Sequence, residues 1–114
     1  MILLNFFFFL EKPFFHIQPT DVTVPAGNSA TFQCSVKGGK NPKISWYYGS
    51  RVLSQHIHDS DTSATVNKND DLIISNTIIG APKTVVCSYE DSIINKKKYS
   101  GSVSLKVIGK LWLK

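Results

Sequence analysis

Apolar and polar residues alternate along much of this chain, in short segments separated by turn residues. Every second residue of the segment 30–36 is apolar: Ala30, Phe32, Cys34 and Val36. A period of two is the spacing of a strand with one buried face. The turn-forming run Gly-Gly-Lys-Asn-Pro follows at 38–42. We therefore predict a half-buried β-strand that ends at this turn.

Similar patterns predict further short strands elsewhere, at 21–24, 44–47, 51–53, 64–66, 72–74, 85–87 and 103–107. Residues 54–63 are polar and have no period, so we expect a loop there. No segment keeps a helical spacing. Many short strands with turns between them indicate an all-β antiparallel sandwich or barrel.

The length and charge of the chain narrow its class. With 114 residues, of which 18% are charged and 42% hydrophobic, it has the composition of one globular domain. The formal net charge is +5, partly from the run Lys96–Lys98 and from lysines near the C-terminus. This excess slightly favours acidic partners. Nucleic-acid binding is not expected, because the pattern offers no recognition helix or aromatic platform.

The two cysteines, Cys34 and Cys87, restrict the possible chemistry. They cannot hold zinc without histidines or carboxylates at metal spacing. They can form one disulfide, which would place the domain in an oxidising compartment. A redox-active pair is the alternative, but the cysteines are far apart and there is no C-x-x-C motif.

The two ends of the chain differ from its middle. Six of the seven Phe residues lie in the first fifteen positions. The apolar run there is too short for a membrane span, which needs about 20 residues, so we expect no membrane insertion. We expect residues 1–18 and 109–114 to lie outside the domain. The first segment has three interpretations: translated intron, a poor signal peptide, or a real N-terminal segment. The dipeptide Gly109-Lys110 can be encoded by a splice-donor-like sequence, which favours translated intron at the C-terminal edge as well.

Four spacings in residues 19–108 form one recognisable pattern. Gly27 precedes Cys34 by seven residues, and Trp46 follows Cys34 by twelve. Leu72 begins an L-x-I pattern, and Cys87 lies 53 residues after Cys34. These residues resemble the pattern of immunoglobulin domains, most closely the intermediate set of adhesion molecules. The Cys…Trp…Cys spacing is the strong signal for that fold.

The resemblance implies an antiparallel two-sheet sandwich with Greek-key topology. It also implies a Cys34–Cys87 disulfide between the sheets, with the Trp46 indole packed on the sulfurs. The rest of the expected core consists of Phe32, Leu72, Ile74 and Val85. Val85 stands where the family usually has the Tyr of the tyrosine corner, so we expect a looser turn at 77–83.

Other residues are candidates for contacts or chemistry. We expect Tyr47 to face outward from its sheet, and Lys96, Lys97 and Lys98 to lie in the hairpin between the last two strands. These four residues are the candidate partner contacts, and the lysines suit an acidic protein or, weakly, a sulfated glycan. The histidines and carboxylates of 56–61 (His56, His58, Asp59 and Asp61) have a metal-like spacing, but we interpret them as solvated loop residues.

Together these features indicate a binding domain. No nucleophile motif is present, so we expect neither an enzyme nor a cofactor. The resemblance implies a protein-binding module of a larger cell-adhesion, receptor or matrix protein, whose partners are neighbouring immunoglobulin-like domains or a cell-surface ligand. The alternative is a structural module of a giant intracellular muscle-type filament protein, with both cysteines reduced. The chain has no N-x-S/T sequon, which slightly favours that alternative.

Overall fold

A computed structural model describes residues 11–57 and 63–109, and all regular structure in these residues is β. The strands are β1 (Phe14–Ile17), β2 (Val22–Pro25), β3 (Ala30–Phe32), β4 (Ser35–Lys37), β5 (Lys43–Tyr48), β6 (Arg51–Leu53), β7 (Ala64–Val66), β8 (Leu72–Ile74), β9 (Lys83–Asp91), β10 (Lys96–Tyr99) and β11 (Val103–Ile108). These described ranges contain no helix that is long and apolar enough to cross a membrane.

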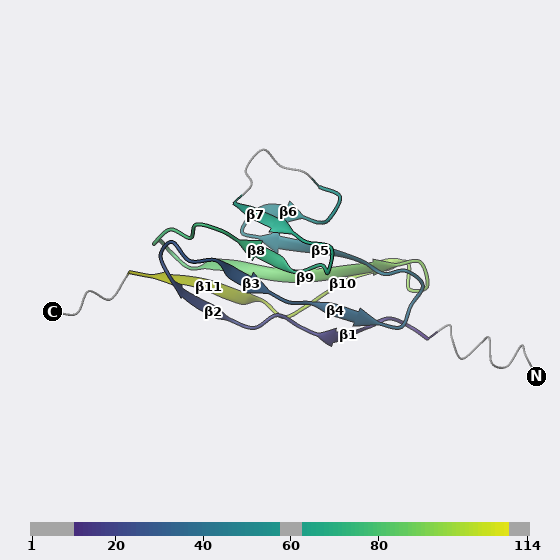
Figure 1. Cartoon of the computed structure of the whole chain (residues 1–114). Helices are drawn as coiled ribbons and strands as arrows, with labels where there is room; N and C mark the ends of the chain where they lie inside the picture. The colour runs from purple at the N-terminus through teal and green to yellow at the C-terminus, as the bar shows by residue number, and fades with distance from the viewer. Residues whose placement is uncertain (1–10, 58–62, 110–114) are drawn as a thin grey trace, which may run out of the picture.

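The strands form two layers (Figure 1). One layer is a six-stranded sheet with the order β2-β11-β9-β5-β6, in which β10 also pairs with β9. The other contains the β3-β8-β7 sheet and the β1–β4 pair, because β3 and β4 are consecutive parts of one chain segment. Neighbouring strands such as β3 and β8 are distant in sequence, as a Greek key requires. The predicted sandwich is confirmed, with the addition that β2 runs parallel to β11.

The core lies between the layers and follows the alternation of the sequence. Along the strands of both layers, side chains at every second position point inward, and both layers therefore contribute apolar side chains to the core. The five residues predicted for the core are each 3% exposed or less, namely Phe32, Trp46, Leu72, Ile74 and Val85. The rings of Phe32 and Trp46 lie 6.5 Å apart between centroids. At about 25 cal/mol per Å² of buried apolar surface, such aromatic side chains carry much of the stability.

Part of the segment that we expected outside the domain belongs to the sandwich. Strand β1 pairs antiparallel with β4, and Phe15 lies opposite Val36. The Phe15 ring also meets the edge of the Tyr89 ring, with centroids 4.7 Å apart. The expected boundary at residue 19 therefore leaves out a strand. Three of the four β1 residues are exposed, so alternation gave no signal there. Residues 1–10 and 110–114 lie outside the described ranges.

Two glycines allow the N-terminal segment to lie against the turn after β4. Gly38 and Gly39 both have a φ of 76°, a left-handed conformation that side chains disfavour. The Gly39 N–H donates to the Glu11 carbonyl at 2.6 Å. A Cβ at Gly38 would lie 2.6 Å from the Lys12 carbonyl oxygen, so no larger residue fits this approach.

Candidate functional site

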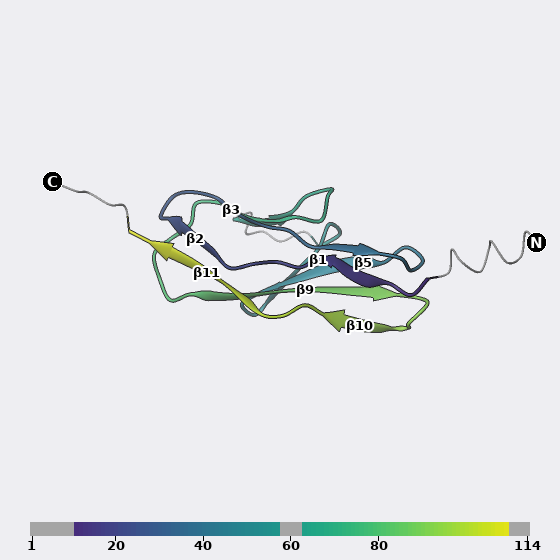
Figure 2. The same cartoon turned by 90° about the horizontal axis from the view of Figure 1, so that it is seen from below.

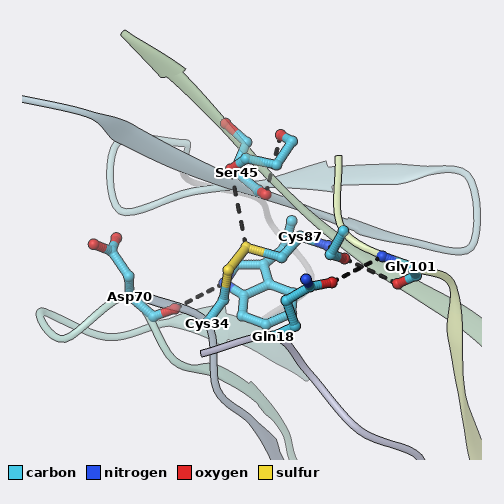
Figure 3. The surroundings of a disulfide bond; sticks show 9 residues. Gln18, Cys34, Ser45, Asp70, Cys87 and Gly101 are labelled. Carbon is cyan, nitrogen blue, oxygen red and sulfur yellow. Dashed lines mark hydrogen bonds between the residues drawn. A yellow bond between two sulfur atoms is a disulfide. The ribbon is translucent and has the colours of Figure 1, made fainter. Parts of the chain in front are cut away.

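Cys34 and Cys87 form a disulfide that links the two layers (Figure 3). Their Cα atoms are 6.5 Å apart, and both residues are buried. Trp46 is the Cα partner of Cys87 in the β5–β9 pairing, so both side chains point into the core. The Trp46 indole N–H donates to the Asp70 carbonyl at 2.8 Å. Both cysteines are enclosed in the core, a position typical of inert structural cysteines.

Tyr47 lies on the outer face of the six-stranded sheet, because its neighbours Trp46 and Tyr48 both pack toward the core. Its ring is 5.9 Å from that of Tyr99, measured between centroids. Tyr99 is 57% exposed, and Val52, the Cα partner of Tyr47 on β6, is 42% exposed. Lys97 completes this group. We call these four residues, Tyr47, Val52, Lys97 and Tyr99, the outer tyrosine surface.

Lys97 and Tyr47 are held together by a hydrogen bond. The Lys97 ammonium donates to the Tyr47 hydroxyl at 3.0 Å and lies 5.6 Å from the ring centroid. This hydrogen bond lowers the pKa of Tyr47, since the ammonium favours the phenolate. It also raises the pKa of Lys97. Lys97 is charged at neutral pH, and its ammonium lies against both the hydroxyl and the ring of Tyr47.

The lysine run does not lie at the tip of its hairpin. Lys96, Lys97 and Lys98 belong to strand β10, and the turn before them occupies 92–95. Because side chains alternate along a strand, Lys97 faces outward, whereas Lys96 and Lys98 lie on the opposite side. There they line an open groove of about 530 Å³ together with Lys12. The structure thus brings Tyr47 together with only one lysine of the three.

Asp91 positions the loops around this hairpin, a role that the sequence did not reveal. Its side chain is 3% exposed. One carboxylate oxygen accepts from the Lys40 N–H at 2.7 Å, and the other accepts from the Ile93 N–H at 2.8 Å. An acidic residue at the end of a strand and before a turn, as Asp91 is, is a weak sequence signal for the hydrogen bond from the Ile93 N–H. The first bond depends on the tertiary fold.

Thr77 anchors the region that lacks the tyrosine corner. Its hydroxyl donates to the Asn28 carbonyl at 2.7 Å, and its own carbonyl accepts from the Gly27 N–H at 2.8 Å. Ile78 and Ile79, which follow, are 82% and 59% exposed. The turn at 77–83 is therefore held by hydrogen bonds at Thr77, whereas the side chains of the next two residues are exposed to solvent.

Only one of the four residues with metal-like spacing in the loop 56–61 lies within the described ranges. His56 is described, whereas His58, Asp59 and Asp61 lie outside them. Within 11–57 and 63–109, no three His, Cys, Asp or Glu side chains are grouped closely enough to hold a metal ion.

Comparison with curated proteins identifies relatives among large multidomain chains. The human peroxidasin homolog is 30% identical over 92 residues, which is 81% of this chain and 6% of that protein. Mouse roundabout homolog 1 is 36% identical over 69 residues, 58% of this chain and 4% of that protein. The chain thus spans a small fraction of each relative's length.

Solved structures share the fold at low sequence identity. Tandem Ig repeats of Dlar align with a TM-score of 0.72 and 19% identity, over 89% of this chain and 50% of that one. An Ig chain from the complex of titin M10 with obscurin-like 1 aligns at 0.70 and 18%, over 89% of this chain and 98% of that one. A chain from the complex of Dpr1 IG1 with DIP-eta IG1 aligns at 0.69 and 16%, over 87% and 98%.

The family assignment rests on most of the described chain. A family model described as "Immunoglobulin domain" matches residues 12–92, a range that contains β1, the disulfide and Trp46. The two-layer sandwich and its cross-layer disulfide are those expected for this family. The chain belongs to the immunoglobulin domain family.

Proposed function

We propose that this domain is a non-catalytic protein-binding module of a larger cell-surface or matrix protein, and that the outer tyrosine surface is its contact face. The observation that carries the proposal is the pair Tyr47 and Tyr99, which stand on an open sheet face beside the charged Lys97. Tyrosine buries a large area at a low cost in side-chain entropy. A tyrosine that is already restrained by a hydrogen bond loses less freedom on binding.

Another immunoglobulin domain is the partner class that we favour. The fold of this chain is similar to that of domains solved in complex with one another, Dpr1 IG1 and DIP-eta IG1 among them. The relatives include roundabout homolog 1, of which this chain matches a small part. These similarities support a protein partner, either a neighbouring domain or a ligand on another surface.

The test is a binding screen with matched variants. The multimerised domain is applied to an array of recombinant ectodomains, and each partner found is measured with Tyr47→Ala and Tyr99→Ala. We expect each substitution to weaken binding at least about tenfold, as for central aromatic contacts. Thr84→Ala is the control, because Thr84 is exposed on the same sheet and is outside the outer tyrosine surface. Equal affinities for all variants would exclude this surface as the contact face.

The second candidate is a structural module of an intracellular filament protein. The fold similarity to a chain from the titin M10 complex is the observation in its favour. The buried Cys34–Cys87 disulfide favours the oxidising environment of a secreted or surface protein. A thiol count on the native protein distinguishes the two: two free thiols would support the filament module, and none would support the surface protein.

A further inference from the structure

A basic groove lies between β1 and β10, on the other side of β10 from the outer tyrosine surface. Lys12 and Phe14 line one wall, and Lys96 and Lys98 line the other. The views in Figures 1 and 2 place these two strands at the same end of the sandwich. The open volume is about 530 Å³, and its base contains the buried Tyr89.

The pairing of β10 explains why its two lysines line this groove. Lys96 lies opposite Asp91 and Lys98 lies opposite Tyr89, and both of these partners have buried side chains. Residues in these positions of a central strand would enter the core. Because β10 is at the edge of its sheet, its inner side opens onto the groove instead.

The groove has a strongly positive character. Three lysines line it, all exposed, and no carboxylate is among its lining residues. Asp91, the Cα partner of Lys96, is 3% exposed and does not line the groove, and its two oxygens accept backbone N–H groups from Lys40 and Ile93. The positive charge is therefore available to an anionic ligand.

We propose that this groove binds a sulfated polysaccharide, with Lys12, Lys96 and Lys98 pairing with its sulfate groups. Ammonium groups on flexible stems suit sulfates that recur along a linear chain, since each lysine acts as an adjustable point charge. Phe14, 45% exposed, offers a ring face against which the apolar side of a sugar packs.

The compartment favours a glycan over a nucleic acid. Basic grooves with aromatic side chains also bind single-stranded nucleic acids. The disulfide, however, indicates an oxidising and mainly extracellular setting. There the abundant linear polyanions are sulfated glycans. Because Lys97 faces the opposite side, this site goes beyond the proposed protein contact and is separable from it.

The test measures binding of the whole chain to a size-defined heparin oligosaccharide, by calorimetry and by salt elution from heparin resin. The variant Lys96→Gln/Lys98→Gln removes two charges from the groove. Lys68→Gln/Lys106→Gln removes the same charge from exposed sites that do not line it. We expect the groove variant to weaken binding at least tenfold and to elute at lower salt. We expect the slope of log K against log [salt] to fall by roughly 1–2. The control should stay within about twofold of the wild type.

Each other outcome overturns the proposal. Equal losses in the two double variants would mean that net charge alone drives binding, and undetectable binding at about 0.15 M salt would exclude the site. Single-stranded DNA or hyaluronan binding as tightly as heparin would point to a general polyanion surface.

Melting curves check that the variants are folded, and Lys12→Gln gives an independent probe of the other wall. Tyr47→Ala should keep full heparin affinity, so a failure of the protein contact is distinguishable from a failure of this site.

Discussion

Trp46 is the largest fully buried side chain in the described part of the molecule, and its single polar atom is satisfied by Asp70. We predict that Trp46→Ala costs about 3–5 kcal/mol of unfolding free energy, because the cavity adds to the lost burial. The Asp70 carbonyl would also lose its donor. Equilibrium denaturation by urea measures this value. A loss below about 1 kcal/mol would contradict a central role in the core.

The hydrogen bond between Lys97 and Tyr47 predicts a pH effect. The ammonium stabilises the phenolate, so Tyr47 should ionise at lower pH in the wild type than in Lys97→Met. The Tyr47 contribution to stability therefore grows as pH rises through its folded pKa. The contribution of Lys97, whose pKa is raised, is lost as pH rises through its own folded pKa.

A carbon NMR titration of the Tyr47 ring in both proteins measures this shift directly. Since the pair lies at the surface, salt should reduce the difference between them. Identical midpoints for wild type and Lys97→Met at low salt would mean that the hydrogen bond does not form in solution.

At this scale the sequence predicted apolar core positions better than polar connections. Phe32 and Val85 follow from alternation, because a local period decides which side of a strand faces inward. Thr77 and Asp91 hydrogen-bond to backbone atoms 49 and 51 residues away, at Asn28 and Lys40. Such bonds depend on which loops the fold brings together, and no local pattern encodes that.

At the scale of elements, the turn after β4 connects three parts of the chain. Gly39 donates to Glu11, and a Cβ on it would lie 2.6 Å from an Asp91 carboxylate oxygen and 2.8 Å from Pro13. We predict that Gly39→Ala destabilises the domain by more than about 1 kcal/mol, because its left-handed φ adds to the clash. Gly101→Ala is the matched control, since nothing lies within 4 Å of a Cβ there.

Thermal melting of both variants decides this point. A Gly39→Ala protein as stable as Gly101→Ala would show that residues 11–13 do not hold this position against the turn. Increased hydrogen exchange in β1 of Gly39→Ala would support the coupling between the turn and this strand.

The two strands absent from the sequence prediction share one physical feature. All four residues of β10 are exposed, and three of four are in β1. Hydrophobic alternation reports burial of one face, so a strand whose side chains remain in solvent leaves no period. The strands with alternating burial, such as β3 and β8, were predicted at their positions.

At the scale of the whole molecule, the disulfide closes a segment of 53 residues across both layers. We predict that Cys34→Ser costs about 4 kcal/mol, because the unfolded chain regains the entropy that the cross-link removes. Cys34→Ala/Cys87→Ala is the companion variant, which leaves no unpaired thiol in the core. Calorimetric melting measures both, and unchanged midpoints would contradict a stabilising role for the bond.

The parallel pairing of β2 with β11 has a mechanical consequence. The described chain enters the sandwich at one end and leaves it at the other (Figure 1). Tension between the two ends would pull β2 and β11 in opposite directions along their common axis. The backbone bonds between them, from Val22 beside Leu105 to Pro25 beside Ile108, would then be sheared together instead of opening one at a time. We therefore expect the domain to resist stretching along its length more strongly than its thermal stability alone would indicate.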